Sequence, residues 1–343
     1  MRIPLFKGLS AIGLDLGSHS VKAVQLAGPE SSTVLASMSV PRTTPRTPLT
    51  AVELQRVREV MDRRGFRGRD VVVAVPSAQL MTAVLELPPR APGVPIEQIA
   101  LTEFARVHKA DPAGLTLSIW DLPASSRASK AMYAQAVGAK SAELEAHIDL
   151  LESVGFNVVA VDDPYSAAAR GTQFLSRAET GMTAIVDLGW ESGALTLASK
   201  DSVVYTRKLS DAGLETMCRQ AVASTSEALE EVEQLVFRSG LLSNTDTSDD
   251  GDILDILTAA VDEVLKEIDQ AIGYTVHQYP DTAIKQTLLI GGGAAVPGMA
   301  QRFEQELRLP AISANDLDQA KSSGLTAGMM TALGLTVAGR QLR

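Results

Sequence analysis

Residues 12–22 read IGLDLGSHSVK, and this stretch indicates a phosphate-binding hairpin. An apolar strand reaches Asp15, a turn of small residues follows, and a second strand leads back through Lys22. Backbone N–H groups converge on a phosphate only where side chains leave room, which favours such a turn. The candidate donors are Gly17, Ser18, His19 and Ser20. Asp15 stands where a carboxylate would hold Mg²⁺ through water.

Two side chains of this stretch are open to a second interpretation. Lys22 can reach bound phosphates, or it can be a strand lysine exposed on the opposite face. The imidazole of His19 can simply point to solvent, because the loop needs only its backbone N–H.

Two later stretches follow a similar logic. Residues 185–197 (IVDLGWESGALTL) repeat the order strand, Asp187, turn and strand, with Gly189 and Ser192 in the turn. Residues 288–299 (LLIGGGAAVPGM) run from an apolar strand into small residues, on whose bare backbone a flat adenine or ribose could lie. The small residues are Gly291, Gly292, Gly293 and Ala294.

The combination of the three loops carries more weight than any one of them, since Asp-Leu-Gly turns are common in hairpins. Asp187 follows Asp15 by 187 − 15 = 172 residues, and Gly291 follows Asp187 by 291 − 187 = 104 residues. One phosphate hairpin in each half, with a glycine-rich strand end completing the second, predicts a two-lobed clamp around a nucleotide. The two aspartates would face each other across the cleft and share one metal ion.

Composition sets the limits of this interpretation. The 343 residues, 45% of them hydrophobic, suffice for two domains with cores. A net charge of −10 and an aromatic content of 4% argue against nucleic-acid binding. The single cysteine, Cys218, fits a reducing compartment and is expected to be a small buried residue. No stretch approaches the ~20 apolar residues of a membrane span, and Asp15 interrupts the only apolar N-terminal run, so we expect a cytoplasmic protein without direct membrane insertion.

Alternation and periodicity predict an α/β protein. The expected strands are 11–16, 21–26, 33–40, 70–75, 80–87, 115–122, 132–137, 183–188, 193–198 and 203–209. Helical faces are expected at Val52, Val57, Val60 and Met61, at Leu144, Ile148 and Leu151, and along a helix over 254–279 that includes Val276. Residues 242–252 (LSNTDTSDDGD) are polar and acidic, and we expect a surface loop there.

The three loops resemble the phosphate-1, phosphate-2 and adenosine motifs of the actin, Hsp70 and sugar-kinase superfamily. Residues 161–171 (VDDPYSAAARG) resemble the connecting segment of Hsp70-like members. The resemblance implies bound ATP and Mg²⁺, metal contacts at Asp15 and Asp187, and a catalytic role for Asp163 in orienting the attacking water. Asp163 also fits a helix N-cap with Pro164 at the first helical position, and both roles can hold together.

Over essentially its whole length the chain resembles the PilM family of type IV pilus assembly proteins. The similar segments are 12–26, 71–88 (VVVAVPSAQLMTAVLELP), 96–107 (IEQIALTEFARV), 206–213, 228–240 and the tail 328–343. The resemblance implies a two-lobed actin-like ATPase fold, a duplicated ribonuclease-H-like unit, with an inserted FtsA-type interaction subdomain in the first lobe. The implied domains are 1–70 with 161–181 (first-lobe core, 1A), 71–160 (insertion, 1C), 182–225 with 285–330 (second-lobe core, 2A), 226–284 (helical subdomain, 2B) and 331–343 (closing helix).

The resemblance also implies a function and adds two cofactor contacts, Gly213 and Glu233. The protein would be an ATP-binding scaffold of the pilus assembly platform, peripheral at the inner membrane, whose inserted subdomain binds the N-terminal cytoplasmic tail of a PilN-like protein. Other platform proteins and self-association are further expected contacts. Val236 replaces the lysine usual three residues after Glu233, and Trp190 replaces a small residue of the second loop. These departures favour nucleotide binding with at most slow hydrolysis.

Two alternatives stay open at this stage. A small-molecule kinase of the same superfamily needs an aspartate base in a sugar pocket, and neither Asp111 nor Asp121 lies in a recognisable sugar motif. An FtsA-like division scaffold needs a C-terminal amphipathic anchor, and the end, GLTVAGRQLR, has no sustained apolar stripe.

Overall fold

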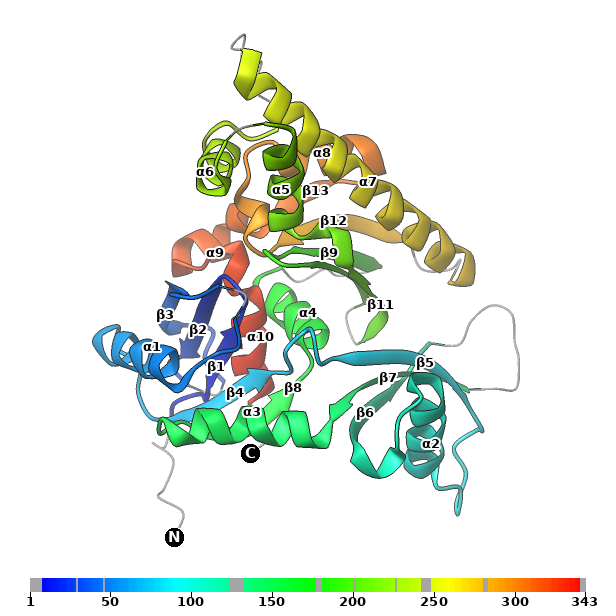
Figure 1. Cartoon of the computed structure of the whole chain (residues 1–343). Helices are drawn as coiled ribbons and strands as arrows, with labels where there is room; N and C mark the ends of the chain where they lie inside the picture. The colour runs from blue at the N-terminus through cyan, green and yellow to red at the C-terminus, as the bar shows by residue number, and fades with distance from the viewer. Residues whose placement is uncertain are drawn as a thin grey trace.

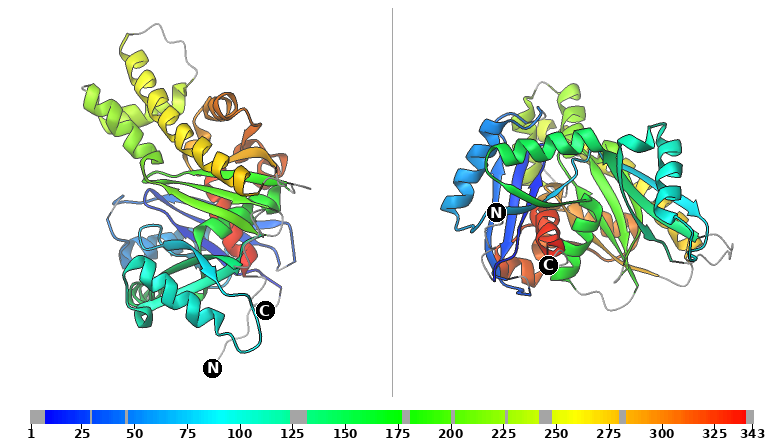
Figure 2. Two further views of the ribbon diagram at one scale, coloured as in Figure 1. Left: turned by 90° about the vertical axis from the view of Figure 1, so that its right-hand side faces the viewer. Right: turned by 90° about the horizontal axis from the view of Figure 1, so that it is seen from below.

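The computed structural model describes residues 8–28, 30–45, 47–123, 132–176, 181–199, 202–225, 227–241, 248–279 and 283–339. Two lobes lie one above the other, and a third, smaller unit projects beside the first (Figure 1). Turned views show the two central sheets stacked with helices between and outside them (Figure 2).

The first lobe is built on a five-stranded sheet of order β3-β2-β1-β4-β8. Its strands are β1 (Ile12–Leu16), β2 (Ser20–Leu26), β3 (Val34–Pro41), β4 (Asp70–Ala74) and β8 (Asn157–Asp162). The first three form an antiparallel meander, whereas β4 and β8 run parallel to β1. Helices α1 (Ala51–Arg63) and α3 (Ser141–Ser153) pack on one face, and α4 (Pro164–Leu175) and α10 (Met330–Ala338) cover the other.

The second lobe repeats this plan in the order β11-β10-β9-β12-β13. Its strands are β9 (Met182–Leu188), β10 (Gly193–Ala198), β11 (Val203–Leu209), β12 (Ile284–Ile290) and β13 (Ala311–Ser313). Again an antiparallel meander is followed by two parallel strands. Its helices are α5 (Leu214–Ser224), α6 (Leu229–Ser239), α7 (Ser248–Gln278), α8 (Met299–Leu307) and α9 (Asp318–Ser323). The same strand order and directions in both halves confirm the duplicated architecture predicted from the two hairpins.

Small residues allow α4 and α10 to cross closely between the sheets. A side chain on Gly334 would overlap the backbone of Ala167, and one on Gly13 would overlap the backbone of Ala332. The last helix therefore brings the end of the chain back against β1 in the first lobe.

The inserted unit has an antiparallel sheet of order β5-β7-β6 with α2 (Ile96–His108) on one face. The strands are β5 (Met81–Leu87), β6 (Leu115–Asp121) and β7 (Met132–Lys140). This differs from the expected boundaries 71–160, because β4 and β8 belong to the first-lobe sheet and α3 packs on that sheet. The missed strand β8 explains the error at the second boundary.

The ten expected strands are present, with ends shifted by at most a few residues. Two expected core positions are wrong, since Val52 is 79% exposed and Val276 is 41% exposed. The expected acidic loop lies outside the described residues over 242–247, and from Ser248 the chain is already part of α7. Short 3₁₀ helices are η1 (Pro112–Gly114), η2 (Ser210–Ala212), η3 (Gly293–Ala295), η4 (Ala314–Asp316) and η5 (Ala327–Met329).

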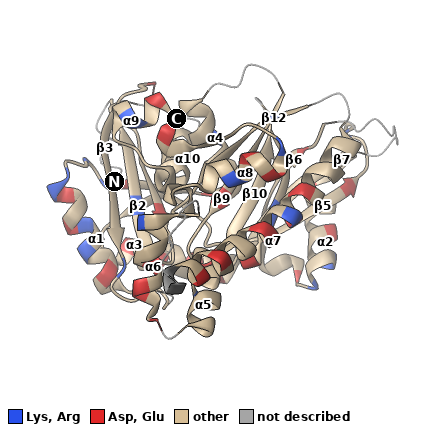
Figure 3. Ribbon diagram, turned by 90° about the horizontal axis from the view of Figure 1, so that it is seen from above, with Lys and Arg blue, Asp and Glu red and all other residues tan. Residues whose placement is uncertain are grey.

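Surface charges of both signs alternate along the helices of the upper face, where acidic residues are frequent on α7 (Figure 3). Within the described ranges, none of the helices combines the length and the apolar character that crossing a membrane requires.

Candidate functional site

The first phosphate loop is the turn that joins β1 to β2. Asp15 and Lys22 lie opposite each other in the register of the two strands, and Lys22 Nζ lies 3.3 Å from Asp15 Oδ2. The ammonium group sits above Gly17, where any Cβ would come within 2.7 Å of it. Lys22 therefore lies on the same side as Asp15, not exposed on the opposite face.

The end of β3 braces this loop from behind. The backbone N–H of Arg42 donates to the carbonyl of His19 at 2.9 Å. The Arg42 guanidinium in turn forms a buried ion pair with Glu53 at 3.1 Å. Burial alone would raise the pKa of Glu53, yet the hydrogen bonds and charge of Arg42, helped by Thr43 and Thr44, lower it to about 2.

The second phosphate loop joins β9 to β10 over residues 189–192. Its carbonyls accept hydrogen bonds from the first turn of α5, from Leu214 N to Gly189 O at 3.0 Å and from Glu215 N to Trp190 O at 2.9 Å. Gly213 is the N-cap of α5, and a side chain there would overlap the backbone of the loop. Gly213 thus supports the turn from behind, while Ser192 is partly exposed at the end of the loop.

Asp15 of the first lobe lies near enough to Asp187 of the second for its charge to act on that carboxyl group. Burial, and after it the charge of Asp15, raise the pKa of Asp187 to about 6 against the opposing charge of Lys22. The charge of Asp15 disfavours the ionisation of Asp187, and a divalent cation held beside both carboxylates would relieve that effect. The residues present therefore fit a Mg²⁺ ion held in part through water.

The residues of the glycine-rich stretch after β12 differ in whether they pack against neighbouring residues or face open space. Gly291, at a φ of +81°, abuts the carboxylate of Asp187, and Gly293 packs against Leu188. Gly292 faces open space, so its bare backbone is accessible to a ligand. Ala294 is 5% exposed and belongs to the core rather than to a ligand-facing surface.

His19, Trp190 and Glu233 meet across the cleft. The rings of His19 and Trp190 have centroids 4.5 Å apart, and His19 Nε2 lies 3.8 Å from Glu233 Oε1. The imidazole contacts both residues while its side chain stays 39% exposed, and its Nδ1 is buried with no hydrogen-bond partner in the part of the chain that the structure describes. Through its contact with His19, Trp190 joins the loop of one lobe to that of the other.

Asp163 is the N-cap of α4 and accepts a hydrogen bond from Ser166 N at 2.8 Å. The structural role expected for it is present. Tyr165, the second residue of the same helix, has a pKa raised to about 12, chiefly by burial and further by the charges of Asp163 and Asp187. Its phenol stays protonated at neutral pH, and it can serve as a hydrogen-bond donor beside both carboxylates.

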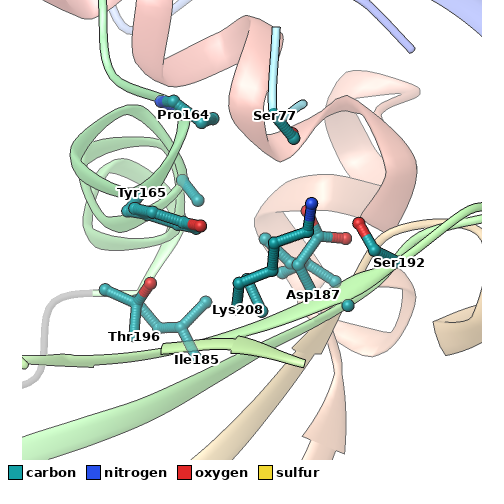
Figure 4. Close-up of a pocket in the computed structure, with 12 residues that line it drawn as sticks. Ser77, Pro164, Tyr165, Ile185, Asp187, Ser192, Thr196 and Lys208 are labelled. Carbon is teal, nitrogen blue, oxygen red and sulfur yellow. The ribbon is translucent and has the colours of Figure 1, made fainter. Parts of the chain in front are cut away.

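A pocket opens between α4 and the second-lobe sheet, beside Asp187 (Figure 4). Asp187 pairs with Ala194 and Ala194 pairs with Lys208, so all three lie in one row across the strands and face the same side. The lining residues are Ser77, Pro164, Tyr165, Ala168, Ile185, Asp187, Ser192, Gly193, Ala194, Thr196, Lys208 and Ile290.

Sequence analysis missed Tyr165, Lys208 and Ser77. The signal for Lys208 was available in principle, because the expected hairpins place it two strands from Asp187 in the same row. Cys218 is fully buried as predicted, and burial together with the charge of Glu233 raises its pKa to about 12.

Comparisons with known proteins agree with this geometry. The family model described as type IV pilus assembly protein PilM matches residues 13–332. A chain of the solved PilM-PilN type IV pilus biogenesis complex has a TM-score of 0.78 at 20% identity, over 96% of this chain and 98% of that one. MreB5 of Spiroplasma citri bound to AMPPNP has a TM-score of 0.55 at 14% identity, over 96% and 95%. The ethanolamine utilization protein EutJ of Carboxydothermus hydrogenoformans has a TM-score of 0.57 at 14% identity, over 98% and 92%.

A search of curated protein sequences gave no match. At these identities the structural likenesses show the fold, and the fold they share with this chain is the two-lobed actin-like one.

Proposed function

The chain belongs to the family of type IV pilus assembly protein PilM, and on that basis we propose that it is an ATP-binding scaffold of the pilus assembly platform. The observation that carries the nucleotide part of this proposal is the meeting of Asp15 and Asp187 across the lobes, with Lys22 beside them. Similarity to MreB5, which was solved with AMPPNP, supports the same conclusion.

In this proposal each loop has a separate task. Asp15 and Asp187 hold Mg²⁺, and the turn residues Gly17 to Ser20 and Gly189 to Ser192 bind the phosphates, with Lys22 adding charge. Gly292 and Glu233 border the adenosine side. The bound metal would supply charge neutralisation to the phosphates. Gly213, Gly291, Gly293 and Ala294 keep these groups in place by packing rather than by contact with the ligand.

We propose slow hydrolysis at most. Asp163 is engaged as a helix cap and only one of its oxygens, Oδ1, receives the bond from Ser166, so the other oxygen is the one that would orient water. The His19–Trp190 contact occupies the space between the two turns, and it must open or shift for rapid exchange of nucleotide.

The proposed partner is the N-terminal cytoplasmic tail of a PilN-like inner-membrane protein, since a PilM chain has been solved in a complex with PilN. The tail would bind between the inserted unit and the first lobe, and would place the protein at the cytoplasmic side of the inner membrane. The same proposal includes contacts with other platform proteins, self-association and a role in twitching motility. It also treats residues 226–284 as a separate helical subdomain of the second lobe.

Calorimetry of Mg-ATP binding to the purified chain tests the nucleotide part. The wild-type protein should bind with micromolar or tighter affinity, and the Asp15→Ala/Asp187→Ala variant should lose most of it. A matched control is Asp149→Asn, which removes an exposed carboxylate on α3. A folded wild-type protein that binds no Mg-ATP would refute the proposal and leave an actin-shaped scaffold without a nucleotide.

A further inference from the structure

The inserted unit touches the second lobe through Trp120. On β6, Leu117 and Ile119 turn toward the core under α2, so Trp120 projects from the opposite face of the strand. Its indole Nε1 donates to the carbonyl of Val203 at 2.8 Å, and its ring packs against the core of the second lobe. Figure 1 shows β11, which begins at Val203, next to the sheet of the inserted unit.

Strand β11 joins this contact directly to the second phosphate loop. Val203 pairs with Ala198 at one end, and Leu209 pairs with Gly193, next to the loop, at the other. Seven extended residues span about 20 Å. Beyond Leu209 the chain reaches Gly213 and the α5 amides that hold the loop carbonyls. β11 pairs with β10 from Val203 to Leu209, with one irregularity in the register between Leu197 and Ala198, so a displacement of the loop can pass along the strand to Val203.

The inserted unit also meets the cleft where it leaves the first lobe. Ser77 lies in the connection between β4 and β5 and lines the pocket beside Asp187 and Lys208. The inserted unit is therefore attached to both sides of the cleft, to the pocket through Ser77 and to the far end of β11 through Trp120.

We propose that Trp120 is a positioning residue that couples the nucleotide cleft to the inserted unit. This inference rests on the proposed nucleotide function, and adds the route by which that site is regulated. A ligand that fixes the second lobe against the first stabilises the Trp120–Val203 contact, and a partner that holds the inserted unit acts on the same contact from the other side. Linkage requires the two effects to be equal in size.

Hydrogen–deuterium exchange on the full chain, with and without Mg-AMPPNP, tests the coupling. In the wild-type protein, the analogue should slow exchange in the two phosphate hairpins and also in β6 and β7, the latter about five-fold or more, the low end of ordinary couplings. Trp120→Phe keeps an aromatic ring but removes the N–H donor, so the hairpins should stay protected while β6 and β7 return toward their ligand-free rates. Ser118→Ala, exposed on the same face of β6, is the matched control and should behave as the wild type.

The outcomes separate the two proposals. Protection of the hairpins without any change in β6 and β7 of the wild-type protein overturns the coupling and leaves nucleotide binding intact. Equal protection of β6 and β7 in wild type and Trp120→Phe also overturns the coupling, because the indole hydrogen bond would then not transmit the effect of the nucleotide. No protection at either place, at analogue concentrations far above micromolar, sinks both the nucleotide site and the coupling built on it.

Discussion

A methyl group added at Gly291 should disturb the cleft as well as the stability of the fold, and a second glycine with a similar backbone allows the two effects to be told apart. Its φ is +81°, and a Cβ there would lie 2.7 Å from the carbonyl oxygen of Leu188 and would overlap the carboxylate of Asp187. Gly65 has nearly the same φ, +86°, with nothing within 4 Å of its Cβ position. The substitutions Gly291→Ala and Gly65→Ala therefore share the backbone strain and differ in the overlap.

The expected magnitudes follow from that difference. The positive φ costs an alanine about 1–2 kcal/mol, of which a few tenths to 1 kcal/mol is offset by the lower entropy of the unfolded chain. Overpacking adds about 1–3 kcal/mol at Gly291 only. We expect Gly65→Ala to destabilise by about 1 kcal/mol and Gly291→Ala by about 2–4 kcal/mol. Since Asp187 must move to admit the methyl group, Mg-ATP affinity should fall about ten-fold or more in Gly291→Ala alone.

Denaturant or thermal unfolding gives the stability difference, and calorimetry gives the affinity. For the stability measurement alone, Gly292→Ala is a second control in the same loop, because its Cβ would enter open space and its φ is not positive. The reasoning is refuted if Gly291→Ala loses no more stability than Gly65→Ala and binds Mg-ATP as tightly as the wild type.

Three further predictions concern carboxylates of the site and its support. Asp163→Asn should keep the α4 cap, whereas Asp163→Ala should lose about 1 kcal/mol of stability. If the Asn variant melts as the wild type but turns over ATP more slowly, Asp163 orients the attacking water. If its turnover is unchanged, Asp163 is only a helix cap. For Asp187, the pKa rises on folding from 3.8 to about 6, so its ionisation opposes folding above that pH. Without Mg²⁺, Asp187→Asn should therefore stabilise the protein at pH 8 by up to about 3 kcal/mol, and this gain should fade as the pH drops through 6 toward 4. A variant that is no more stable than the wild type at pH 8 would contradict this prediction. Glu53, with its pKa lowered from 4.5 to about 2, contributes stability that is present above pH 4.5 and lost as the pH falls toward 2. Glu53→Gln should remove up to about 3 kcal/mol at pH 7 and flatten the acid limb of the unfolding curve, and an unchanged limb would exclude the Arg42 pair as its cause.

Local patterns were sufficient to predict the two phosphate hairpins, because each consists of residues that are neighbours in sequence. The strand positions of Asp15, Lys22 and Asp187 were predictable for that reason, and the duplicated sheets followed from the hairpins. The boundaries of the inserted unit were not predictable in the same way. The sequence of β4 predicts a strand, but its residues do not indicate whether that strand pairs with β1 or with β5.

Contacts between distant residues account for the other misses. Glu53 is buried although charged because Arg42 reaches it from the end of β3, and its burial moves the apolar face of α1 away from Val52. The encounter of His19 with Trp190 joins residues 190 − 19 = 171 positions apart, and it arises only once the lobes face each other. No periodicity in either segment carries that information.

The position of α6 in the fold bears on why valine stands at position 236, where a lysine is usual in the resembling families. Val236 is 2% exposed within the second-lobe core, so a lysine at this position would bury its ammonium group unless the helix turned. Glu233, one turn earlier on α6, is only partly buried, and its Oε1 lies 3.8 Å from His19 Nε2 of the opposite lobe. Val236 therefore belongs to the packing of the second lobe, and the His19 side chain, through Glu233 and Trp190, belongs to the contact between the lobes.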